Sequence, residues 1–361
     1  AGPLRPGVFL ESFGGRSAGD NPAAICEDLA AHGVEAPLWW SVVDGTVRVP
    51  AGARPVVVGS PQWVEALRTS RVIVTNDHLP SWFSKREGQH LLQTWHGTPI
   101  KKLLHDAPKA VTLRYRRLMD RQVPQWDLLL AQSPQAARRL QQALGYRGPV
   151  RVGEYPRNVR LLGGAEVRRR ARHELGIAPG KPVILYAPTW RESLRPSTGA
   201  AGCATVHGPG PVGELDGPRL AELLDAVVLM RSHHMNRGGC VPGMIDVSGY
   251  PSVEELMLAA DILVSDYSSI FFDFALTGKP AVVYTPDLAS YRDVERGLYG
   301  DWPLDSGLPV AADHDELASH LQRLLGDIDV AEGRYSLLEV EPVPILDNLT
   351  WIRGWIARFL S

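Results

Sequence analysis

Cysteine is scarce in this chain. Only Cys26, Cys203 and Cys240 occur among the 361 residues, and they do not stand at metal-ligand spacing. This excludes a disulfide-rich secreted scaffold and indicates reduced thiols in a cytoplasmic protein. Long apolar runs are missing as well. None approaches the roughly 18 residues that span a membrane, and the opening residues lack the apolar core of a secretory signal.

An excess of charge of either sign is also absent. The 38 Lys and Arg residues nearly balance the 40 Asp and Glu residues, and the net charge at pH 7 is −2. This balance argues against a general binder of polyanions. Locally, however, residues 101–121 hold seven basic residues against Asp106 and Asp120. Two interpretations stay open: a solvated helix face, or a basic surface that meets anionic lipid headgroups or a phosphate-rich polymer.

Short apolar runs alternate with helical patterns along the chain. The runs predict buried strands, and the helical patterns at residues 62–69 and 134–144 lie between them. This alternation predicts an α/β protein with parallel, doubly wound sheets, and the pattern restarts after a basic helix at residues 166–175. The predicted strands are 8–10, 38–43, 56–59, 72–75, 91–95, 127–131, 183–186, 227–230, 244–247, 262–265 and 281–284.

The length of 361 residues exceeds one ordinary core, so we expect two doubly wound α/β domains. We place them at residues 1–155 and 156–346. Apolar residues at helical spacing predict a terminal helix within residues 347–361. Residues 193–217 are rich in Gly, Pro, Ser and Ala without periodicity, which predicts a mobile loop.

Residues 93–99, which read Gln-Thr-Trp-His-Gly-Thr-Pro, are the most informative stretch. An apolar, extended run leads into His96, a turn with Gly97 and Thr98 follows, and a lysine pair begins at Lys101. This pattern places an imidazole at the carboxyl end of a strand, close in sequence to two ammonium groups. Such a position is typical of a general base that acts on an anionic substrate. The alternative interpretation is a turn with a surface histidine.

Polar residues also follow the predicted strand 262–265. Ser268 and Ser269 stand where a helix N-cap belongs, so the amides of the first turn and the helix dipole would point at a phosphate. Asp273 follows one helical turn after Ser269 and can accept a hydrogen bond from a sugar hydroxyl. The alternative is a well-capped core helix without a ligand.

Two more strand ends carry cations. Arg231 and His233 follow strand 227–230. His234 is adjacent to His233, and neighbours on an extended chain face opposite ways, so at most one of the two serves a site and a zinc pair is disfavoured. Arg191 follows strand 183–186 and can clamp a phosphate or carboxylate, although an exposed loop arginine is the simpler interpretation.

The first strand has the same kind of exit. Glu11 and Ser12 follow it, a Gly-rich stretch allows close approach of a ligand, and Asp20 and Asn21 begin a helix. A full dinucleotide fingerprint is missing, so NAD is only weakly indicated.

All these residues lie at the carboxyl ends of strands, where open α/β sheets bind ligands. We therefore expect the two halves to face each other across a cleft.

Taken together, these motifs resemble the CDP-glycerol glycerophosphotransferase family, the polymerases of teichoic-acid-type polyol phosphates. The resemblance covers nearly the whole chain. The motifs that carry it are Glu11-Ser12-Phe13, Asp20-Asn21-Pro22, Gln93 to Pro99 with Lys101-Lys102-Leu103, Tyr155-Pro156-Arg157-Asn158, Leu185 to Arg191, Arg231-Ser232-His233, Ser265 to Ser269, Phe271-Phe272-Asp273, Tyr284 to Arg292 and Arg296-Gly297-Leu298-Tyr299.

The resemblance implies a GT-B-like fold with two Rossmann-like, doubly wound domains. It also implies a transferase that moves glycerol phosphate, or a similar polyol phosphate, from CDP-glycerol and releases CMP. The acceptor would be a hydroxyl of a teichoic-acid-like or other cell-surface polymer, or of a lipid-linked acceptor. His96 would act as the base, and His233 would also be needed for activity. Residues 1–155 would bind the acceptor and residues 156–346 the CDP donor. We expect no cofactor, metal or nucleic acid, and peripheral contact with the inner membrane face through residues 101–121.

The remaining site residues are expected in two groups. The donor-binding group is Arg191, Arg231, Ser265, Asp266, Ser268, Ser269 and Asp273. The group at the acceptor or in the cleft is Glu11, Ser12, Asp20, Asn21, Gly97, Thr98 and Lys101.

The chain departs from the family pattern at Glu154, which enters a segment that is usually Gly-Tyr-Pro, at His234, and at residues 305–310. These departures leave the acceptor and the polyol open. Two rival functions also stay open: a GT-B glycosyltransferase that uses a nucleotide sugar, and a non-catalytic module that binds nucleotide or anionic polymer. Some family members are the back half of larger bifunctional chains, and the abrupt start of this sequence would fit such an excision.

Overall fold

A computed structural model describes residues 2–107, 110–189, 215–231, 244–295, 297–326 and 343–360. The chain divides into two compact units. Unit 1 comprises Ala1–Pro99, Leu103–Arg160 and Val340–Ser361, and unit 2 comprises Ile100–Lys102 and Leu161–Glu339. The chain therefore contributes a short segment to unit 2 directly after Pro99, and its C-terminal end belongs to unit 1.

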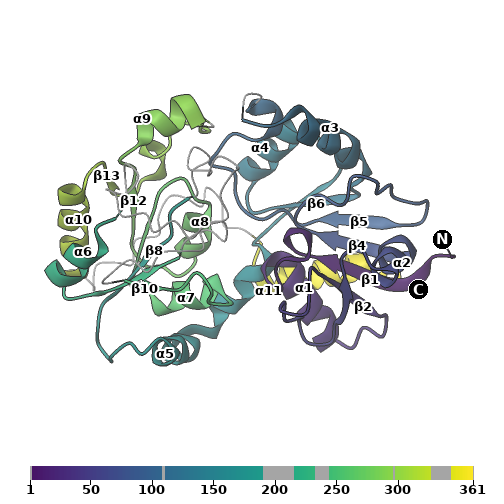
Figure 1. Cartoon of the computed structure of the whole chain (residues 1–361), viewed down its shortest axis with the longest axis horizontal. Helices are drawn as coiled ribbons and strands as arrows, with labels where there is room; N and C mark the ends of the chain where they lie inside the picture. The colour runs from purple at the N-terminus through teal and green to yellow at the C-terminus, as the bar shows by residue number, and fades with distance from the viewer. Residues whose placement is uncertain are drawn as a thin grey trace, which may run out of the picture. The chain divides into compact units, whose positions relative to one another are not determined.

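Unit 1 is built on a seven-stranded parallel sheet with strand order β3-β2-β1-β4-β5-β6-β7 (Figure 1). Because β2 and β3 lie on one side of β1 while β4 and the later strands lie on the other, the winding reverses between β1 and β4. The strands are β1 (Arg5–Glu11), β2 (Leu38–Val42), β3 (Arg54–Val57), β4 (Ser70–Thr75), β5 (His90–Gln93), β6 (Leu128–Ala131) and β7 (Val150–Val152).

Unit 2 repeats this winding in a six-stranded parallel sheet of order β10-β9-β8-β11-β12-β13. Here the reversal lies between β8 and β11. The strands are β8 (Val183–Tyr186), β9 (Val227–Met230), β10 (Ile245–Asp246), β11 (Ile262–Ser265), β12 (Ala281–Tyr284) and β13 (Val310–Ala311).

Helices connect the strands and begin at recognisable signals. The hydroxyls of Ser60 and Ser133 accept hydrogen bonds from the amides of Trp63 and Ala136, and a proline follows each serine in the first turn. The α-helices are α1 (Asp20–Ala31), α2 (Pro61–Thr69), α3 (Leu113–Gln122), α4 (Pro134–Leu144), α5 (Gly164–Glu174), α6 (Gly217–Leu223), α7 (Val253–Ala259), α8 (Ile270–Ala275), α9 (Leu288–Ser290), α10 (His314–Gly326) and α11 (Ile345–Ala357). Short 3-10 or π segments are η1 (Phe13–Gly15), η2 (Leu104–Asp106), η3 (Val123–Gln125), η4 (Pro156–Gly163), η6 (Tyr291–Glu295) and η7 (Leu304–Ser306).

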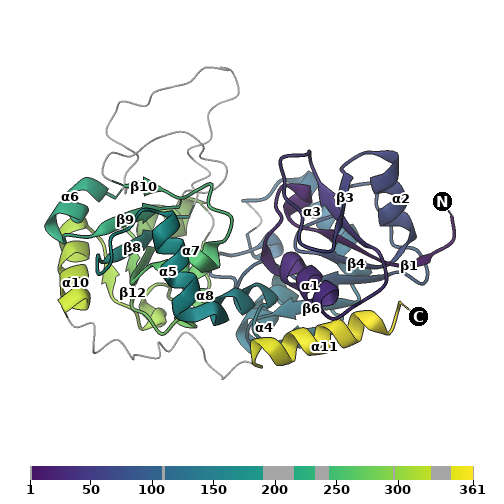
Figure 2. The ribbon, with the colours of Figure 1, turned by 90° about the horizontal axis from the view of Figure 1, so that it is seen from below.

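The C-terminal helix α11 closes one face of the unit 1 sheet beside α1 (Figure 2). Its side chains Leu349, Ile352 and Ile356 are buried in the same cluster as α1 and the strands. On its outer side, Nη1 of Arg353 donates to both carboxylate oxygens of Asp28 at 2.8 Å. Because the apolar stripe of α11 packs against unit 1, the end of the chain belongs to that unit.

The predicted α/β class with two doubly wound parallel sheets is confirmed. Two strands were not predicted, β7 and β13. Both are short and lie at an edge of their sheet, so they lack the long apolar run of a central strand. The predicted domain boundary lies after residue 155, whereas the chain passes from unit 1 to unit 2 after Arg160. The predicted loop 193–217 lies almost entirely outside the described residues.

Candidate active site in unit 1

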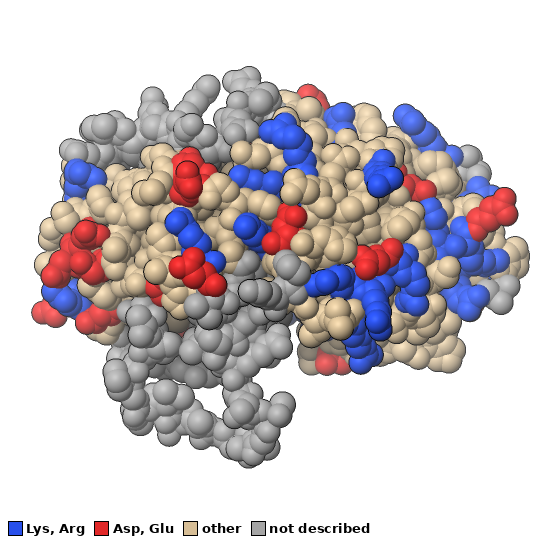
Figure 3. All heavy atoms as spheres, turned by 90° about the horizontal axis from the view of Figure 1, so that it is seen from above, with Lys and Arg blue, Asp and Glu red and all other residues tan. Residues whose placement is uncertain are grey.

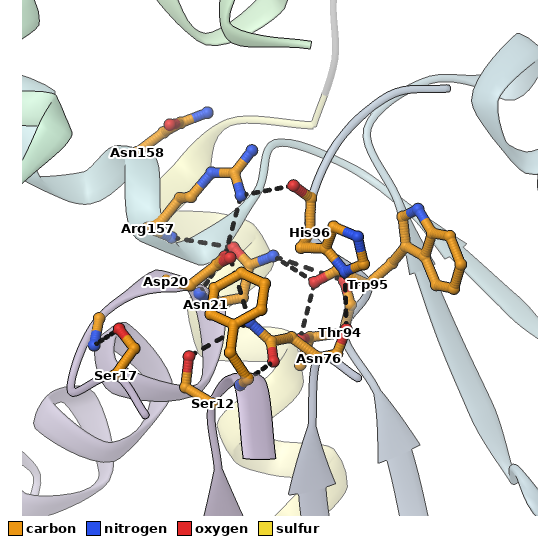
Figure 4. A network of polar contacts seen from close by, with 12 residues as sticks. Ser12, Ser17, Asp20, Asn21, Asn76, Thr94, Trp95, His96, Arg157 and Asn158 are labelled. Carbon is orange, nitrogen blue, oxygen red and sulfur yellow. Dashed lines mark hydrogen bonds and ion pairs between the residues drawn. The ribbon is translucent and has the colours of Figure 1, made fainter. Parts of the chain in front are cut away.

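Polar residues meet at the carboxyl ends of three neighbouring strands of unit 1 (Figure 4). Ser12 follows β1, Asn76 follows β4, and His96 follows β5 by a short turn. Strands β1 and β4 flank the point where the winding reverses, and the diverging connections open a crevice at such a point. The fold therefore brings three segments that are distant in sequence to the edge where α/β proteins bind ligands.

The ring of His96 is held in one tautomer. Its Nδ1 lies 2.7 Å from the carbonyl oxygen of Asn76. A carbonyl can only accept a hydrogen bond, so Nδ1 carries the proton and, in the neutral imidazole, Nε2 keeps a lone pair. The ring stacks on Trp95 at a centroid distance of 4.8 Å and leans on Phe13 at 5.6 Å. This arrangement suits Nε2 to take a proton from a bound hydroxyl.

The backbone around this imidazole is strained. Phe13, Asp20 and Trp95 have φ angles of 48°, 64° and 54°, in the left-handed region that residues with side chains rarely adopt. Gly97, directly after His96, has φ 154°, which favours glycine. Each left-handed non-glycine residue costs on the order of 1–3 kcal/mol, and such conformations persist only where surrounding contacts enforce them.

A buried network supplies those contacts. Nη1 of Arg157, from η4, donates to Oδ1 of Asp20 at 2.9 Å and to the carbonyl of His96 at 3.0 Å. The other oxygen of Asp20 accepts from Nδ2 of Asn76 at 3.1 Å, while Oδ1 of Asn76 accepts from the amide of Phe13 at 2.9 Å. In Figure 4 these side chains converge on the turn that carries His96. The network thus braces both strained turns that hold the ring.

Asn21 adds a second brace. Its Nδ2 donates to the carbonyl of Trp95 at 3.1 Å, and its Oδ1 accepts from the amide of Arg157 at 3.2 Å. Ser12 joins the network through its hydroxyl, which accepts from Nδ2 of Asn76 at 3.2 Å. The predicted residues Ser12, Asp20 and Asn21 are therefore brought together with His96 in unit 1.

Thr98 anchors the other side of the turn. Its hydroxyl donates to Oε1 of Gln132 at 2.9 Å, and Nε2 of Gln132 donates to Oε2 of Glu154 at 3.0 Å. Nδ2 of Asn158 donates to the same oxygen at 3.3 Å. Glu154, which appeared as an odd acidic insertion in the sequence, is thus a buried acceptor that ties three segments of unit 1 together.

Five of these supporting residues were not among the predicted site residues: Asn76, Gln132, Glu154, Arg157 and Asn158. Asn76 follows a predicted strand, so the rule that selected the other strand-end residues would have found it. Arg157 stands in one of the motifs that carry the family resemblance. Gln132 likewise follows a predicted strand, residues 127–131, so the same rule would have found it. Glu154 gave no signal of this kind, because its contacts depend on which strands become neighbours.

Glu11, at the end of β1, lies in the interior. Ser41 donates its hydroxyl proton to Oε2 of Glu11 at 2.7 Å, and the indole of Trp63 donates to the Ser41 oxygen at 2.8 Å. Burial raises the pKa of Glu11 from 4.5 to about 7, against the smaller lowering effect of the Ser41 hydrogen bond, and the charge of Asp77 raises it further. Burial removes the water that would stabilise the charged carboxylate, and the single hydrogen bond from Ser41 does not make up for this loss.

This pKa predicts a pH-dependent stability that Glu11→Gln should remove. Between pH 4.5 and about 7 the folded protein keeps a proton that the unfolded chain has lost, so stability falls as the pH rises through this window and stays low above it. The pKa gap corresponds to about 3 kcal/mol. We expect Glu11→Gln to be more stable than the parent at pH 8 and equal to it at pH 4 in urea unfolding.

The matched control is Glu65→Gln, because the side chain of Glu65 is 57% exposed in its pair with Arg5. Exposed pairs of this kind contribute little, so this variant should follow the parent at both pH values. A Glu11→Gln protein that loses stability at pH 8 would contradict the prediction.

In unit 2, the predicted residues at the end of β11 hold the segment that follows β8. The hydroxyl of Ser265 donates to the carbonyl of Ala187 at 2.6 Å. Oδ1 of Asp266 accepts from the amides of Thr189 and Tyr267 at 2.8 and 2.6 Å. Both side chains are buried. These contacts shape the two loops at the reversal point of the unit 2 sheet, the place where such sheets bind ligands.

The neighbouring predicted residues have distinct surroundings. The hydroxyl of Ser268 accepts from the amide of Ile270 at 3.3 Å, and Ser269 occupies the N-cap position of α8. Asp273 is buried in α8. Nη1 of Arg231 donates to the carbonyls of Val247 and Tyr250 at 3.2 and 2.9 Å, and burial lowers the pKa of this guanidinium.

The other predicted residues fall elsewhere. Arg191 and His233 lie outside the described residues. Lys101 belongs to the short segment of unit 2 and forms an antiparallel bridge with Leu298. The amide of Lys102 donates to the carbonyl of Gly297 at 3.0 Å, and the amide of Tyr299 donates to that of Ile100 at 2.8 Å. The structure thus gathers the His96 group in unit 1 and the Ser265 to Asp273 group in unit 2.

Among the described residues, no group of three or more His, Cys, Asp or Glu residues is placed to hold a metal ion. Over the same residues, no helix has both the length and the apolar character needed to cross a membrane.

The sequence profile of the CDP-glycerol:poly(glycerophosphate) glycerophosphotransferase family matches residues 5–339. The chain belongs to this family. Among the relatives of this chain, the teichoic acid poly(glycerol phosphate) polymerase of Bacillus subtilis (strain 168) is 29% identical over 89% of this chain and 44% of its own. The teichoic acid glycerol-phosphate transferase of Staphylococcus aureus (strain NCTC 8325 / PS 47) is 30% identical over 88% of this chain and 83% of its own. The chain thus spans less than half the length of the Bacillus relative.

Solved structures give the same assignment. A variant of the wall teichoic acid polymerase TagF matches 99% of this chain and 90% of its own, with a TM-score of 0.85 and 27% identity. A TagF variant soaked with CDPG matches with a TM-score of 0.84 and 26% identity. A UDP-GlcNAc 2-epimerase from Neisseria meningitidis, at 12% identity and a TM-score of 0.55, shares the fold alone. The predicted GT-B-like class is confirmed.

Proposed function

We propose that this protein transfers glycerol phosphate, or a similar polyol phosphate, from a CDP-activated donor to a hydroxyl of a teichoic-acid-like or other cell-surface polymer, or of a lipid-linked acceptor, and releases CMP. The observation that carries the proposal is the fixed tautomer of His96, whose Nδ1 binds the Asn76 carbonyl so that Nε2 is the basic nitrogen. Membership of the family supports CDP-glycerol as the donor.

The proposed step is a displacement at the β-phosphorus of the donor. The acceptor hydroxyl gives its proton to Nε2 of His96 as its oxygen forms the new bond to phosphorus. The bond from that phosphorus to the CMP oxygen breaks, and CMP leaves with the electron pair. A positioned base of this kind contributes about 10²–10⁴-fold in rate.

We assign the two sides of the reaction to different residues. Ser12, Asp20, Asn21, Gly97 and Thr98 shape the acceptor side around His96, with Glu11 behind them and Lys101 nearby in the chain. On the donor side, Arg191, His233 and the amides beside Ser268 and Ser269 would stabilise phosphate charge, and Asp273 would accept from polyol or ribose hydroxyls. Ser265, Asp266 and Arg231 would keep the donor loops in place through the hydrogen bonds described above.

A donor panel tests the reaction class. Purified protein is given CDP-glycerol, CDP-ribitol or UDP-sugars with an acceptor, and release of CMP or UDP is measured. We expect CMP release from CDP-glycerol, with CDP-ribitol as the informative comparison for the polyol. Release of UDP alone would favour a nucleotide-sugar glycosyltransferase of the same fold. Tight binding of CDP-glycerol without turnover on any acceptor would favour a non-catalytic module.

We also propose peripheral binding to the cytoplasmic face of an anionic membrane through residues 101–121. The basic residues of this segment supply the attraction, and Leu113, which is 65% exposed, can enter the headgroup region. Flotation with anionic vesicles should carry the protein upward at low salt and less at high salt, because salt screens such an attraction. Absence from the floating fraction at low salt would contradict this proposal.

A further inference from the structure

Unit 1 has a concave site near the candidate active site and distinct from it. It is a pocket of about 510 Å³ between the loop after β4 and helix α3. Its polar lining comes from His78, Ser81, Thr112, Arg114, Arg117 and Arg121. We call it the α3 pocket. A ring contact between His78 and Tyr115, with centroids 5.8 Å apart, joins its two walls.

The three arginines of the α3 pocket form one stripe. Positions 114, 117 and 121 recur at the spacing that places side chains on one face of a helix. All three are exposed, and none has an ion-pair partner among the described residues. By contrast, Asp120 on the same helix pairs with His105 at 2.9 Å. The pocket therefore presents three uncompensated positive charges.

This arrangement fits phosphate groups spaced along a chain. A guanidinium binds phosphate oxygens through two parallel N–H donors, and the hydroxyls of Ser81 and Thr112 can add hydrogen bonds. From Arg114 to Arg121 the helix rises about 10 Å, which exceeds the reach of a single phosphate. A polymer with one negative charge per repeat can contact the stripe at more than one point.

The position of the pocket connects it to the chemistry. His78 is the second residue after Asn76, whose carbonyl orients His96, and two residues span at most about 7 Å of extended chain. We propose that the α3 pocket binds an internal phosphodiester of the acceptor polymer while the terminal hydroxyl of that polymer lies at His96. This inference rests on the proposed function for its substrate class.

The competing ligand is a lipid surface, since the same helix begins with the exposed Leu113. The lining favours the polymer as the ligand of the pocket itself, because arginines and hydroxyls line a hollow that a phosphodiester can enter, whereas Leu113 is not part of that lining. Figure 3 shows Lys and Arg side chains gathered over the part of unit 1 that holds α3. Such a field would attract either ligand, so the experiment separates the two.

The test compares two triple variants with the same change in charge. The pocket variant is Arg114→Gln, Arg117→Gln and Arg121→Gln. The control variant is Arg48→Gln, Arg138→Gln and Arg147→Gln, which removes three exposed arginines that unit 1 carries outside the pocket and that have no ion-pair partner among the described residues. Each is titrated with a glycerol phosphate oligomer, with a single glycerol phosphate unit and with anionic vesicles, and melting temperatures verify the fold.

We expect the pocket variant to raise the Kd for the oligomer about tenfold, with the control variant near the parent, because three modest ion pairs are lost. The KM for CDP-glycerol and turnover on a single-unit acceptor should stay unchanged. Equal oligomer affinity in the two variants would overturn the inference. So would a pocket variant that loses only vesicle binding, which would assign the stripe to lipid. If the parent binds oligomer through the stripe but never releases CMP, the proposed function fails and the polymer site stands.

Discussion

Replacing His96 by alanine is expected to slow CMP release about 10²–10⁴-fold while CDP-glycerol still binds. The reason is the tautomer: with Nδ1–H committed to the Asn76 carbonyl, Nε2 is the nitrogen that can accept the acceptor's proton. Release of CMP measures turnover, and calorimetry with CDP-glycerol measures binding. The two readouts separate loss of the base from loss of the donor site.

Two controls sharpen this result. His96→Asn places an amide N–H where Nδ1–H stood, so it can keep the contact with Asn76 while it lacks a basic nitrogen. We expect it to be as slow as the alanine variant but closer to the parent in thermal stability. His32→Ala removes an imidazole that is 52% exposed, in α1's C-terminal region, and should leave turnover unchanged. Parent-like turnover in His96→Asn would remove His96 from the chemistry.

Replacing Arg157 by methionine is expected to lower the free energy of unfolding by about 3–5 kcal/mol, because it leaves the carboxylate of Asp20 buried without its cation. The two side chains are only 10% and 8% exposed, and their atoms lie 2.9 Å apart. The same substitution frees the carbonyl of His96, which Arg157 holds at 3.0 Å. Turnover should therefore fall as well, and urea unfolding with CMP release measures both effects.

The matched control is Arg160→Met in the same segment. Arg160 pairs with Glu27 at 2.8 Å, but these side chains are 28% and 39% exposed, so the loss should stay within about 1 kcal/mol. Adding Asp20→Asn to Arg157→Met should recover part of the lost stability, since the unpaired charge is then gone. If Arg157→Met costs no more than Arg160→Met, the network does not brace the His96 turn in the way we describe.

The two sheets were predictable because their central strands are short, apolar and separated by helical patterns. Strands β4, β6, β8 and β11 are buried on both faces and read as continuous apolar runs. The edge strands β7 and β13 were not predicted because they are short and lack the continuous apolar run of a central strand. Once the strands are predicted, the polar residues that follow their carboxyl ends can be identified, and His96, Ser12 and Asp266 are among them.

The contacts that give those residues their roles could not be predicted. Nothing local in the sequence pairs Arg157 with Asp20, 137 positions away, or sends Glu154 to Gln132 and Asn158. Glu154 shows the difficulty most clearly, since it reads as a charged insertion and proves to be a buried acceptor. Such pairs exist because strand order brings the loops together, and strand order is a property of the whole sheet.

What this amino-acid sequence determined by itself is the central strands, the doubly wound class, the family and the identity of the imidazole at the end of β5. These follow from local patterns, since an apolar run or a helix cap acts over a few residues. Only the tertiary structure decided which nitrogen of His96 is basic, which carboxylate is buried, and that three arginines of α3 line a hollow close to Asn76. Those properties depend on distances between segments far apart in the chain, and packing alone sets such distances.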